Sequence, residues 1–169
     1  MTSKIDPKVL SERYRLAVVE QLGLVATVDA ANDVVFKHPD LGTFYFSLDK
    51  DDPEYLMLVF PNFVDKSATN GDCMKLLEII NKVNRKSKGV KLTMRDDADC
   101  NVMATAESFV AAPDDGPSQD FLDATIRRTL SAVRSCVGSV IEEIKELKES
   151  SVDGSKASSS GDSKSTSSI

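Results

Sequence analysis

Hydrophobic positions in the last third of the chain repeat with the period of an α-helix. Because side chains three and four positions apart share one face of a helix, this spacing predicts an amphipathic helix from Ser118 to about Lys148. Ser118 can cap its first turn, because a serine hydroxyl accepts from a free backbone N–H. The repeating apolar residues are Ile126, Leu130, Val133, Val137, Val140, Ile144 and Leu147.

This helix is expected to be longer than the sheet it covers. It spans ~46 Å at 1.5 Å per residue, whereas a six-residue strand spans only ~20 Å. Its distal apolar seam therefore has two alternative destinations, the core of its own chain or the interface of a homodimer. Gly138 favours the close approach of another element at mid-helix. The seam comprises Val133, Val137, Val140, Ile144 and Leu147.

Two further helices are predicted nearer the N-terminus. The first has Asp6 as N-cap, Pro7 at its first position and Gly23 at its end, which are the residue types that favour those positions. The second begins near Asn70 and ends at Gly89. Its expected core-facing stripe contains Cys73, Leu76, Leu77, Ile80 and Val83.

The segments between the helices read as β-strands joined by short polar turns. Alternation of apolar and polar residues predicts strands at 24–28, 34–38, 41–49, 90–95 and 100–111. Residues 54–60 are apolar on both faces, as expected of a central strand. The order is thus α, three or four strands, α, two strands, α, in its shortest form α-β-β-β-α-β-β-α. This is an α+β domain with helices on an antiparallel sheet.

Composition sets the limits of this domain. The segment from Ser150 onward is half serine with three apolar residues, and such a segment cannot bury enough surface to offset its ordering entropy. We expect a disordered tail at 150–169 and one domain at 1–149.

The net charge of −6 lies in that domain, because the charges of the tail cancel. An acidic domain repels nucleic acid and anionic lipid at long range, so we expect neither as a partner. A basic run is interpreted as a solvated helix end, with nucleic-acid regulation as a weaker alternative; no aromatic residue is interleaved for stacking. It contains Lys82, Arg85, Lys86, Lys88 and Lys91.

The three cysteines, Cys73, Cys100 and Cys136, are far apart and odd in number. This favours three buried, unreactive thiols over a disulfide framework, and hence a reducing compartment. Neither a charged-then-apolar leader nor an apolar run of membrane-spanning length is present in the sequence given. We therefore expect a cytoplasmic protein.

Signatures of catalysis are missing from the sequence. His38 is the single histidine, and acidic turns at 49–55, 95–99 and 113–116 lack the glycine and spacing of a calcium loop. No glycine-rich phosphate loop or nucleophile elbow can be written. We expect no catalytic, cofactor-binding or metal-ligating residue. The alternative is a small-ligand sensor or enzyme with an unrecognised pocket.

One motif resembles a known family. Residues 79–94, "IINKVNRKSKGVKLTM", contain Asn-x-x-Asn-Arg at Asn81, Asn84 and Arg85, followed by a hairpin, an acidic loop and a long helix. This arrangement resembles the YbjN-like family of bacterial proteins, which shares the fold of type III secretion chaperones. The resemblance covers roughly residues 8–147 as element order. Many members carry tryptophan between the asparagines, where this chain has Val83.

The resemblance implies a small, acidic, often dimeric protein that binds other proteins rather than catalysing a reaction. Our leading hypothesis is a non-enzymatic module, chaperone-like or regulator-like, acting through its sheet edge and apolar helix or sheet surfaces. Asn84 points into the apolar stripe of the second helix, where an amide needs partners. We favour a structural tie from Asn84 to the backbone of a neighbouring strand over a ligand contact.

Overall fold

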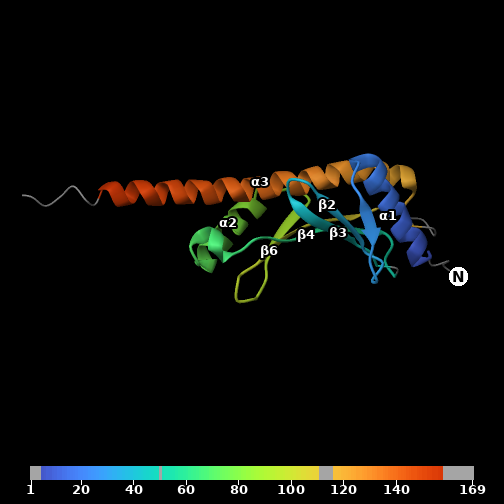
Figure 1. Ribbon diagram of the computed structural model, residues 1–169, viewed down its shortest axis with the longest axis horizontal. Helices are drawn as coiled ribbons and strands as arrows, with labels where there is room; N and C mark the ends of the chain where they lie inside the picture. The colour runs from blue at the N-terminus through green and yellow to red at the C-terminus, as the bar shows by residue number, and fades with distance from the viewer. Residues whose placement is uncertain (1–4, 50, 111–115, 158–169) are drawn as a thin grey trace, which may run out of the picture.

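A six-stranded antiparallel sheet and three α-helices make up the described part of the chain (Figure 1). The computed structural model describes residues 5–49, 51–110 and 116–157, the last seven by their backbone alone. The α+β class is confirmed, with four strands ahead of the second helix. The elements are α1 (Pro7–Leu22), β1 (Ala26–Val28), β2 (Val34–His38), β3 (Gly42–Ser47), β4 (Tyr55–Val64), the 3-10 helix η1 (Lys66–Thr69), α2 (Cys73–Asn84), β5 (Val90–Met94), β6 (Val102–Phe109) and α3 (Gln119–Ala157).

The strands lie in the order β1-β2-β3-β4-β6-β5, and every neighbouring pair is antiparallel. The apolar strand β4 occupies an interior position, between β3 and β6, as its sequence predicts. β1 and β5 form the two edges. The register aligns Tyr45, Val59, Thr105 and Lys91 in one row across four strands.

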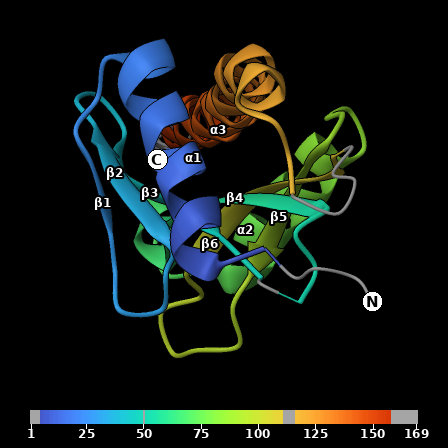
Figure 2. The same ribbon diagram turned by 90° about the vertical axis from the view of Figure 1, so that its right-hand side faces the viewer.

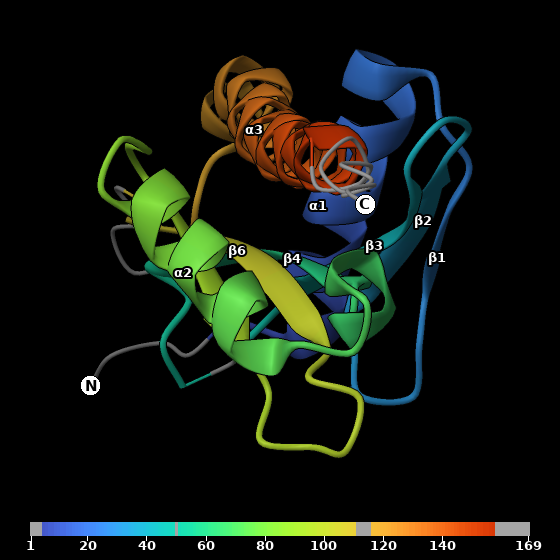
Figure 3. The ribbon, with the colours of Figure 1, turned by 90° about the vertical axis from the view of Figure 1, so that its left-hand side faces the viewer.

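The helices lie on one face of the sheet. Figures 2 and 3 show the strands curving round α1 and α3, and α2 packs against β5 and α3. Alternate strand residues, such as Phe44 and Phe46 of β3 or Leu56 and Leu58 of β4, point into the core beneath the helices. Within the described ranges, no helix is long and apolar enough to cross a membrane.

The ends of α1 follow the sequence signals. The Asp6 carboxylate accepts a hydrogen bond from the backbone N–H of Lys8 at 2.8 Å, and Pro7 occupies the first helical position. Gly23 adopts φ +66° and donates its N–H to the Val19 carbonyl oxygen. This left-handed conformation is accessible to glycine without a Cβ clash, so the predicted helix end is confirmed.

α2 is shorter than predicted at both ends. The Asp72 carboxylate caps it by accepting from the N–H of Lys75, so the helix starts at Cys73. Asn70, expected near its start, instead terminates η1 with φ +57°, and Gly89, expected at its end, lies in the loop before β5 with φ +70°. Both residue types tolerate the left-handed region, so each marks a chain reversal outside the helix.

α3 carries the predicted apolar seam into the core of its own chain. Val133, Val137, Val140 and Ile144 are buried there, and Leu147 is partly buried against the same core. The helix runs to Ala157, past the expected end at Lys148 and eight residues into the predicted tail, while 158–169 lie outside the described residues. Its last turns project beyond the sheet (Figure 1).

Within the described part of this chain, no element approaches Gly138 closely. A Cβ built at this position would meet no atom within 4 Å. The glycine is therefore not required by the packing of α3 against the described residues of its own chain.

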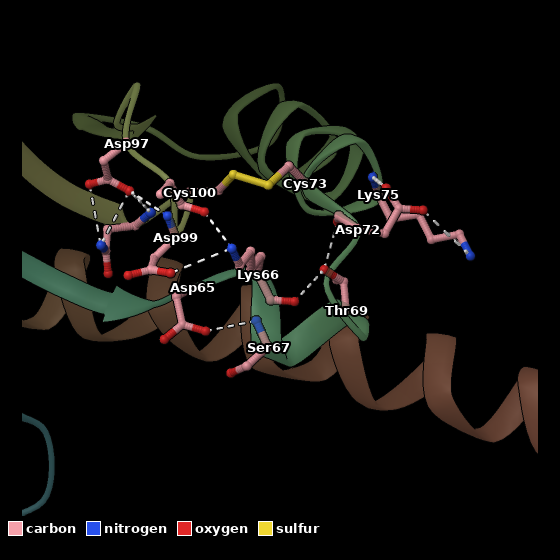
Figure 4. Close-up of a disulfide and its surroundings, with 12 residues drawn as sticks. Asp65, Lys66, Ser67, Thr69, Asp72, Cys73, Lys75, Asp97, Asp99 and Cys100 are labelled. Atoms are coloured by element: carbon pink, nitrogen blue, oxygen red, sulfur yellow. Dashed lines mark hydrogen bonds and ion pairs between the residues drawn. A yellow bond between two sulfur atoms is a disulfide. The ribbon is translucent and has the colours of Figure 1, made fainter.

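The cysteine prediction is wrong for two of three residues. Cys73, the first residue of α2, and Cys100, in the loop between β5 and β6, form a disulfide with their Cα atoms 6.1 Å apart (Figure 4). Cys136 is a free, buried thiol, as predicted. Because the argument for a reducing compartment rested on unpaired cysteines, it no longer holds.

Candidate functional site

The candidate functional site is the face of the sheet that the helices leave uncovered, here called the outer face. Leu56, Leu58 and Phe60 of β4 belong to the core, so the alternating residues of that strand point to the opposite side. Pairing across the sheet places further residues on the same side. The outer face comprises Thr27, Val35, Lys37, Thr43, Tyr45, Ser47, Tyr55, Met57, Val59, Lys91, Thr93, Met103, Thr105, Glu107 and Phe109.

The centre of the outer face is inaccessible to solvent although no helix covers it. Val59 is 0% exposed and does not belong to the core cluster on the helix side, and Thr105, its partner in β6, is 2% exposed. Val59 is paired with Tyr45 on one side and with Thr105 on the other. Two buried side chains, one apolar and one polar, thus lie at the centre of a face that no helix covers.

Glu107 organises the polar part of the outer face. Its carboxylate accepts hydrogen bonds from the Tyr55 hydroxyl at 2.7 Å and the Thr105 hydroxyl at 2.8 Å, and pairs with the Lys91 ammonium at 2.8 Å. These donors, Lys91 foremost, lower the pKa of Glu107 to about 2. A carboxylate so strongly held in its ionised form is a poor general base, so we interpret the cluster as a fixed element of the surface.

An exposed aromatic residue lies at one end of the outer face. Phe109 is 82% exposed and packs edge-on against the Tyr55 ring, with the centroids 5.8 Å apart. The exposed acidic residues Asp49, Asp52 and Glu54 belong to the turn that leads into β4, which begins at Tyr55. An exposed aromatic group next to concentrated negative charge is a combination suited to recognition.

The side chain of Asn84 occupies the backbone hydrogen-bonding groups at the centre of the β5 edge. Its side-chain oxygen accepts from the Leu92 N–H at 2.9 Å, and its side-chain nitrogen donates to the Leu92 carbonyl at 3.0 Å. These are the contacts that a structural tie requires. Asn81 and Arg85, the other residues of the motif, are exposed on α2 and at its C-cap.

The disulfide belongs to a second tie, between the start of α2 and the β5–β6 loop (Figure 4). Lys66 donates its backbone N–H to the Asp99 carbonyl at 3.0 Å and its ammonium to the Ala98 carbonyl. The Lys66 ammonium also lies 3.5 Å from the Asp99 carboxylate. A covalent bond and several polar contacts thus anchor this loop.

The charged groups of the acidic β5–β6 loop and of the basic run interact with other groups of the chain. Asp97 accepts from the backbone N–H groups of Asp99 and Asn101, an arrangement that lowers the pKa of Asp97, chiefly through Asn101. In the basic run, Lys82 pairs with Glu143 of α3. Within the described residues, no group of three histidine, cysteine or acidic side chains is placed to hold a metal ion.

Cys136 lies beside a cavity of about 350 Å³ between the end of α2 and α3. Its thiol is 3.2 Å from the Ser87 hydroxyl, and burial raises the pKa of Cys136. A protonated, buried thiol is a weak nucleophile, so the free cysteine is not a reactive centre.

Sequence reasoning missed the outer-face cluster, although part of it is visible in the pattern. Thr105 and Glu107 alternate with Ala104 and Ala106 in β6, which indicates a polar face opposite an apolar one. The partners Tyr55 and Lys91 come from other strands. Only the strand order brings them to Glu107, so no local signal could have found them.

Comparisons with known proteins support the fold. No family model matches the sequence, and no curated protein matches it. Among solved structures, a protein from Methanothermobacter thermautotrophicus is 19% identical, with a TM-score of 0.54, over 82% of this chain and 98% of its own. YbjN from E. coli, described as a candidate transcription regulator, is 14% identical, with a TM-score of 0.55, over 80% of this chain and 92% of its own. The chain therefore has a YbjN-like α+β fold, as the resemblance predicts.

Proposed function

We propose that the protein is a non-enzymatic binding module, regulator-like or chaperone-like, whose outer face accepts a segment of another protein. The observation that carries this proposal is the uncovered sheet face, with a solvent-inaccessible centre at Val59 and Thr105 and an 82% exposed phenylalanine, Phe109, at its end. An isolated exposed apolar residue needs no explanation, but Phe109 packs against the Tyr55 ring at the end of this face, and such a pair supports an interaction surface.

The charges at this end of the outer face favour a basic partner segment. Asp49, Asp52 and Glu54 belong to the turn that ends at Tyr55, and the chain as a whole carries a net charge of −6. A segment with an aromatic or long aliphatic anchor and adjacent lysine or arginine residues complements this end in both apolar and electrostatic character.

The sheet edges contribute less to binding than the sequence suggests. At β5, the backbone groups of Leu92 that a further strand would use are occupied by Asn84. At the other edge, β1 contains only the three residues Ala26–Val28. A partner strand would find few free backbone groups at either place, so the proposed docking uses the face of the sheet.

The fold supports the same class of function without specifying the partner. YbjN is described as a candidate regulator, and such proteins act by binding rather than by turnover. The described residues offer no catalytic constellation. A homodimer formed through the outer face is the competing occupant.

Selection from a displayed library of random peptides tests the proposal on the full chain. We expect enrichment of peptides that combine an aromatic residue with lysine or arginine. Their affinity should fall about tenfold in the Phe109→Ser variant, because an aromatic anchor contributes about 1–2 kcal/mol or more. Glu54→Gln should weaken binding at low salt and change it little at high salt.

The matched control is Ile141→Ser, which removes an exposed apolar residue from α3, 42% exposed. It should leave peptide binding unchanged. Equal losses in Phe109→Ser and Ile141→Ser, or no enriched peptide at all, would contradict the proposal. A dimer in analytical ultracentrifugation that Phe109→Ser dissociates would assign the outer face to a second copy of the chain.

A further inference from the structure

A cavity on the helix side of the sheet has a positively charged lining, although the net charge of the chain is −6. It has a volume of about 400 Å³ and lies between the end of α1, the β2–β3 turn and α3. Its polar lining consists of Gln21, His38, Asp40, Arg127, Ser131 and Arg134. We call this the arginine cavity. It lies at the His38 end of the strands, whereas Tyr55 and Phe109 lie at the other end.

Two cationic groups in the arginine cavity have no protein counterion. The side chains of Arg127 and Arg134 make no ion pair or hydrogen bond with any described residue, although acidic residues outnumber basic ones in the chain, 27 to 21. Lys82 and Lys91, by contrast, are each paired with a glutamate. Asp40 is the only carboxylate among the cavity's described lining residues, so this lining carries a positive excess.

The spacing of the two arginines suits a ligand with separated charges. Seven residues along one helix correspond to nearly two turns, so Arg127 and Arg134 project from the same face of α3 about 10 Å apart along its axis. Side chains of this length can converge on one ligand from both ends. The guanidinium group presents several N–H donors in a planar fork that matches phosphate or carboxylate oxygens.

His38 adds a third polar side chain to the cavity. Its Nδ1 accepts a hydrogen bond from the Asp40 N–H at 3.2 Å. With Nδ1 engaged in this way, Nε2 is the imidazole nitrogen left for a ligand.

We propose that the arginine cavity binds a small polyanion, a compound with two or more phosphate or carboxylate groups, through Arg127, Arg134 and His38. This inference goes beyond the proposed protein-binding function, because it concerns a different surface and a different class of ligand. A small ligand is favoured over nucleic acid because the chain has net negative charge and the cavity contains Asp40. Such a ligand would bridge α1, α3 and the β2–β3 turn.

Isothermal titration of the full chain with inorganic pyrophosphate, and separately with citrate, tests the proposal and distinguishes phosphate from carboxylate recognition. At least one of them should bind at low salt. Arg127→Gln and Arg134→Gln should each weaken that binding about tenfold, the effect of losing a charge-assisted hydrogen bond. Arg128→Gln is the matched control, since Arg128 is exposed on the same helix but does not line the cavity.

Circular dichroism of each variant confirms that the helices are retained. The proposal is overturned if neither anion binds at millimolar concentration, or if Arg128→Gln weakens binding as much as the two cavity variants. Tight binding of duplex DNA that all three substitutions weaken equally would also overturn it, by showing a nucleic-acid surface. Because Phe109→Ser leaves this cavity intact, its effects on peptide binding are separable from the effects measured here.

Discussion

The side-chain amide of Asn84 forms two hydrogen bonds with the backbone of Leu92, one through its oxygen and one through its nitrogen. β5 has a strand neighbour only on its β6 side, so these bonds occupy groups on the free edge of the sheet. An unpaired strand edge is a template for association with another chain. Asn84 therefore joins α2 to β5 and also blocks the middle of an edge strand.

Removing this amide should weaken folding and expose the edge. We expect Asn84→Ala to lower the free energy of unfolding by about 1–2 kcal/mol, because it leaves a donor and an acceptor of Leu92 without protein partners. Urea denaturation measures the loss, and light scattering should show increased self-association. Asn84→Asp should be intermediate at neutral pH, since a carboxylate can accept from the Leu92 N–H but cannot donate to its carbonyl.

Asn81→Ala is the control for this pair of variants. Asn81 lies one turn earlier on α2 and is exposed, so its loss should change the free energy of unfolding by less than about 0.5 kcal/mol. A similar loss for Asn81→Ala and Asn84→Ala would show that helix propensity, rather than the tie to Leu92, produces the effect.

The disulfide should make stability depend on reductant. Cys73 and Cys100 are separated by 27 positions, and closing a loop of this size stabilises a fold by about 2–4 kcal/mol. We expect the protein to unfold at a lower urea concentration in dithiothreitol. The double variant Cys73→Ser with Cys100→Ser should match the reduced protein and should not respond to reductant.

Counting thiols provides an independent check of the same bond. Unfolded without reductant, the chain should present one reactive thiol, that of Cys136; after reduction it should present three. Three thiols before reduction would contradict the pairing.

The Glu107 cluster should stabilise the protein in a defined pH range. Because Lys91, Tyr55 and Thr105 lower the folded-state pKa of Glu107 to about 2, the unfolded chain binds this proton first as the pH falls, near pH 4.3. The contribution of Glu107 is complete above that value and is lost between about pH 4.5 and 2. Glu107→Gln should therefore flatten the acid side of the stability profile and cost under about 1 kcal/mol at pH 7.

Denaturation midpoints at several pH values between 7 and 2.5 measure this difference. Glu142→Gln, which changes an exposed glutamate on α3, should leave the shape of the profile unaltered. A parallel displacement of the Glu107→Gln curve at every pH would contradict the assignment of this titration to Glu107.

The seam of α3 offers a fourth prediction. Val140 is 0% exposed within a single chain, so Val140→Ala should lower the free energy of unfolding by about 1.5–3 kcal/mol. The neighbouring change Ile141→Ala, at an exposed position, should cost less than about 0.5 kcal/mol. Because the seam is buried by its own chain, the Val140→Ala loss should be independent of protein concentration; a loss that grows on dilution would place the seam in a dimer.

The fold was largely predictable because its signals are local. Asp6, Pro7 and Gly23 define the ends of α1 through properties of single residues, and the four-and-three spacing of α3 records one buried helix face. The strands followed in the same way from alternation. The ends of α2 were misplaced because Asn70 and Gly89 adopt positive φ in turns outside the helix, and such residues mark a turn whether or not a helix ends there.

The features that escaped prediction depend on contacts between distant segments. Nothing near Cys73 indicates that α2 begins beside the loop containing Cys100; that proximity follows from the order of β6 and β5 in the sheet. The partners of Glu107 and the juxtaposition of His38 with Arg134 likewise arise from tertiary structure. The position of Asn84 in the apolar stripe of α2 indicated that its amide needs a partner, but only the tertiary position of β5 identifies that partner as Leu92.

The sulfur bridge between Cys73 and Cys100 closes the backbone into a ring that contains α2, β5 and the turns at either side. A protease that cuts the exposed connection between Asn84 and Val90 opens this ring without releasing a fragment. The nicked molecule keeps both pieces in one covalent unit, which migrates as a single band on a denaturing gel until a thiol reagent separates it into two.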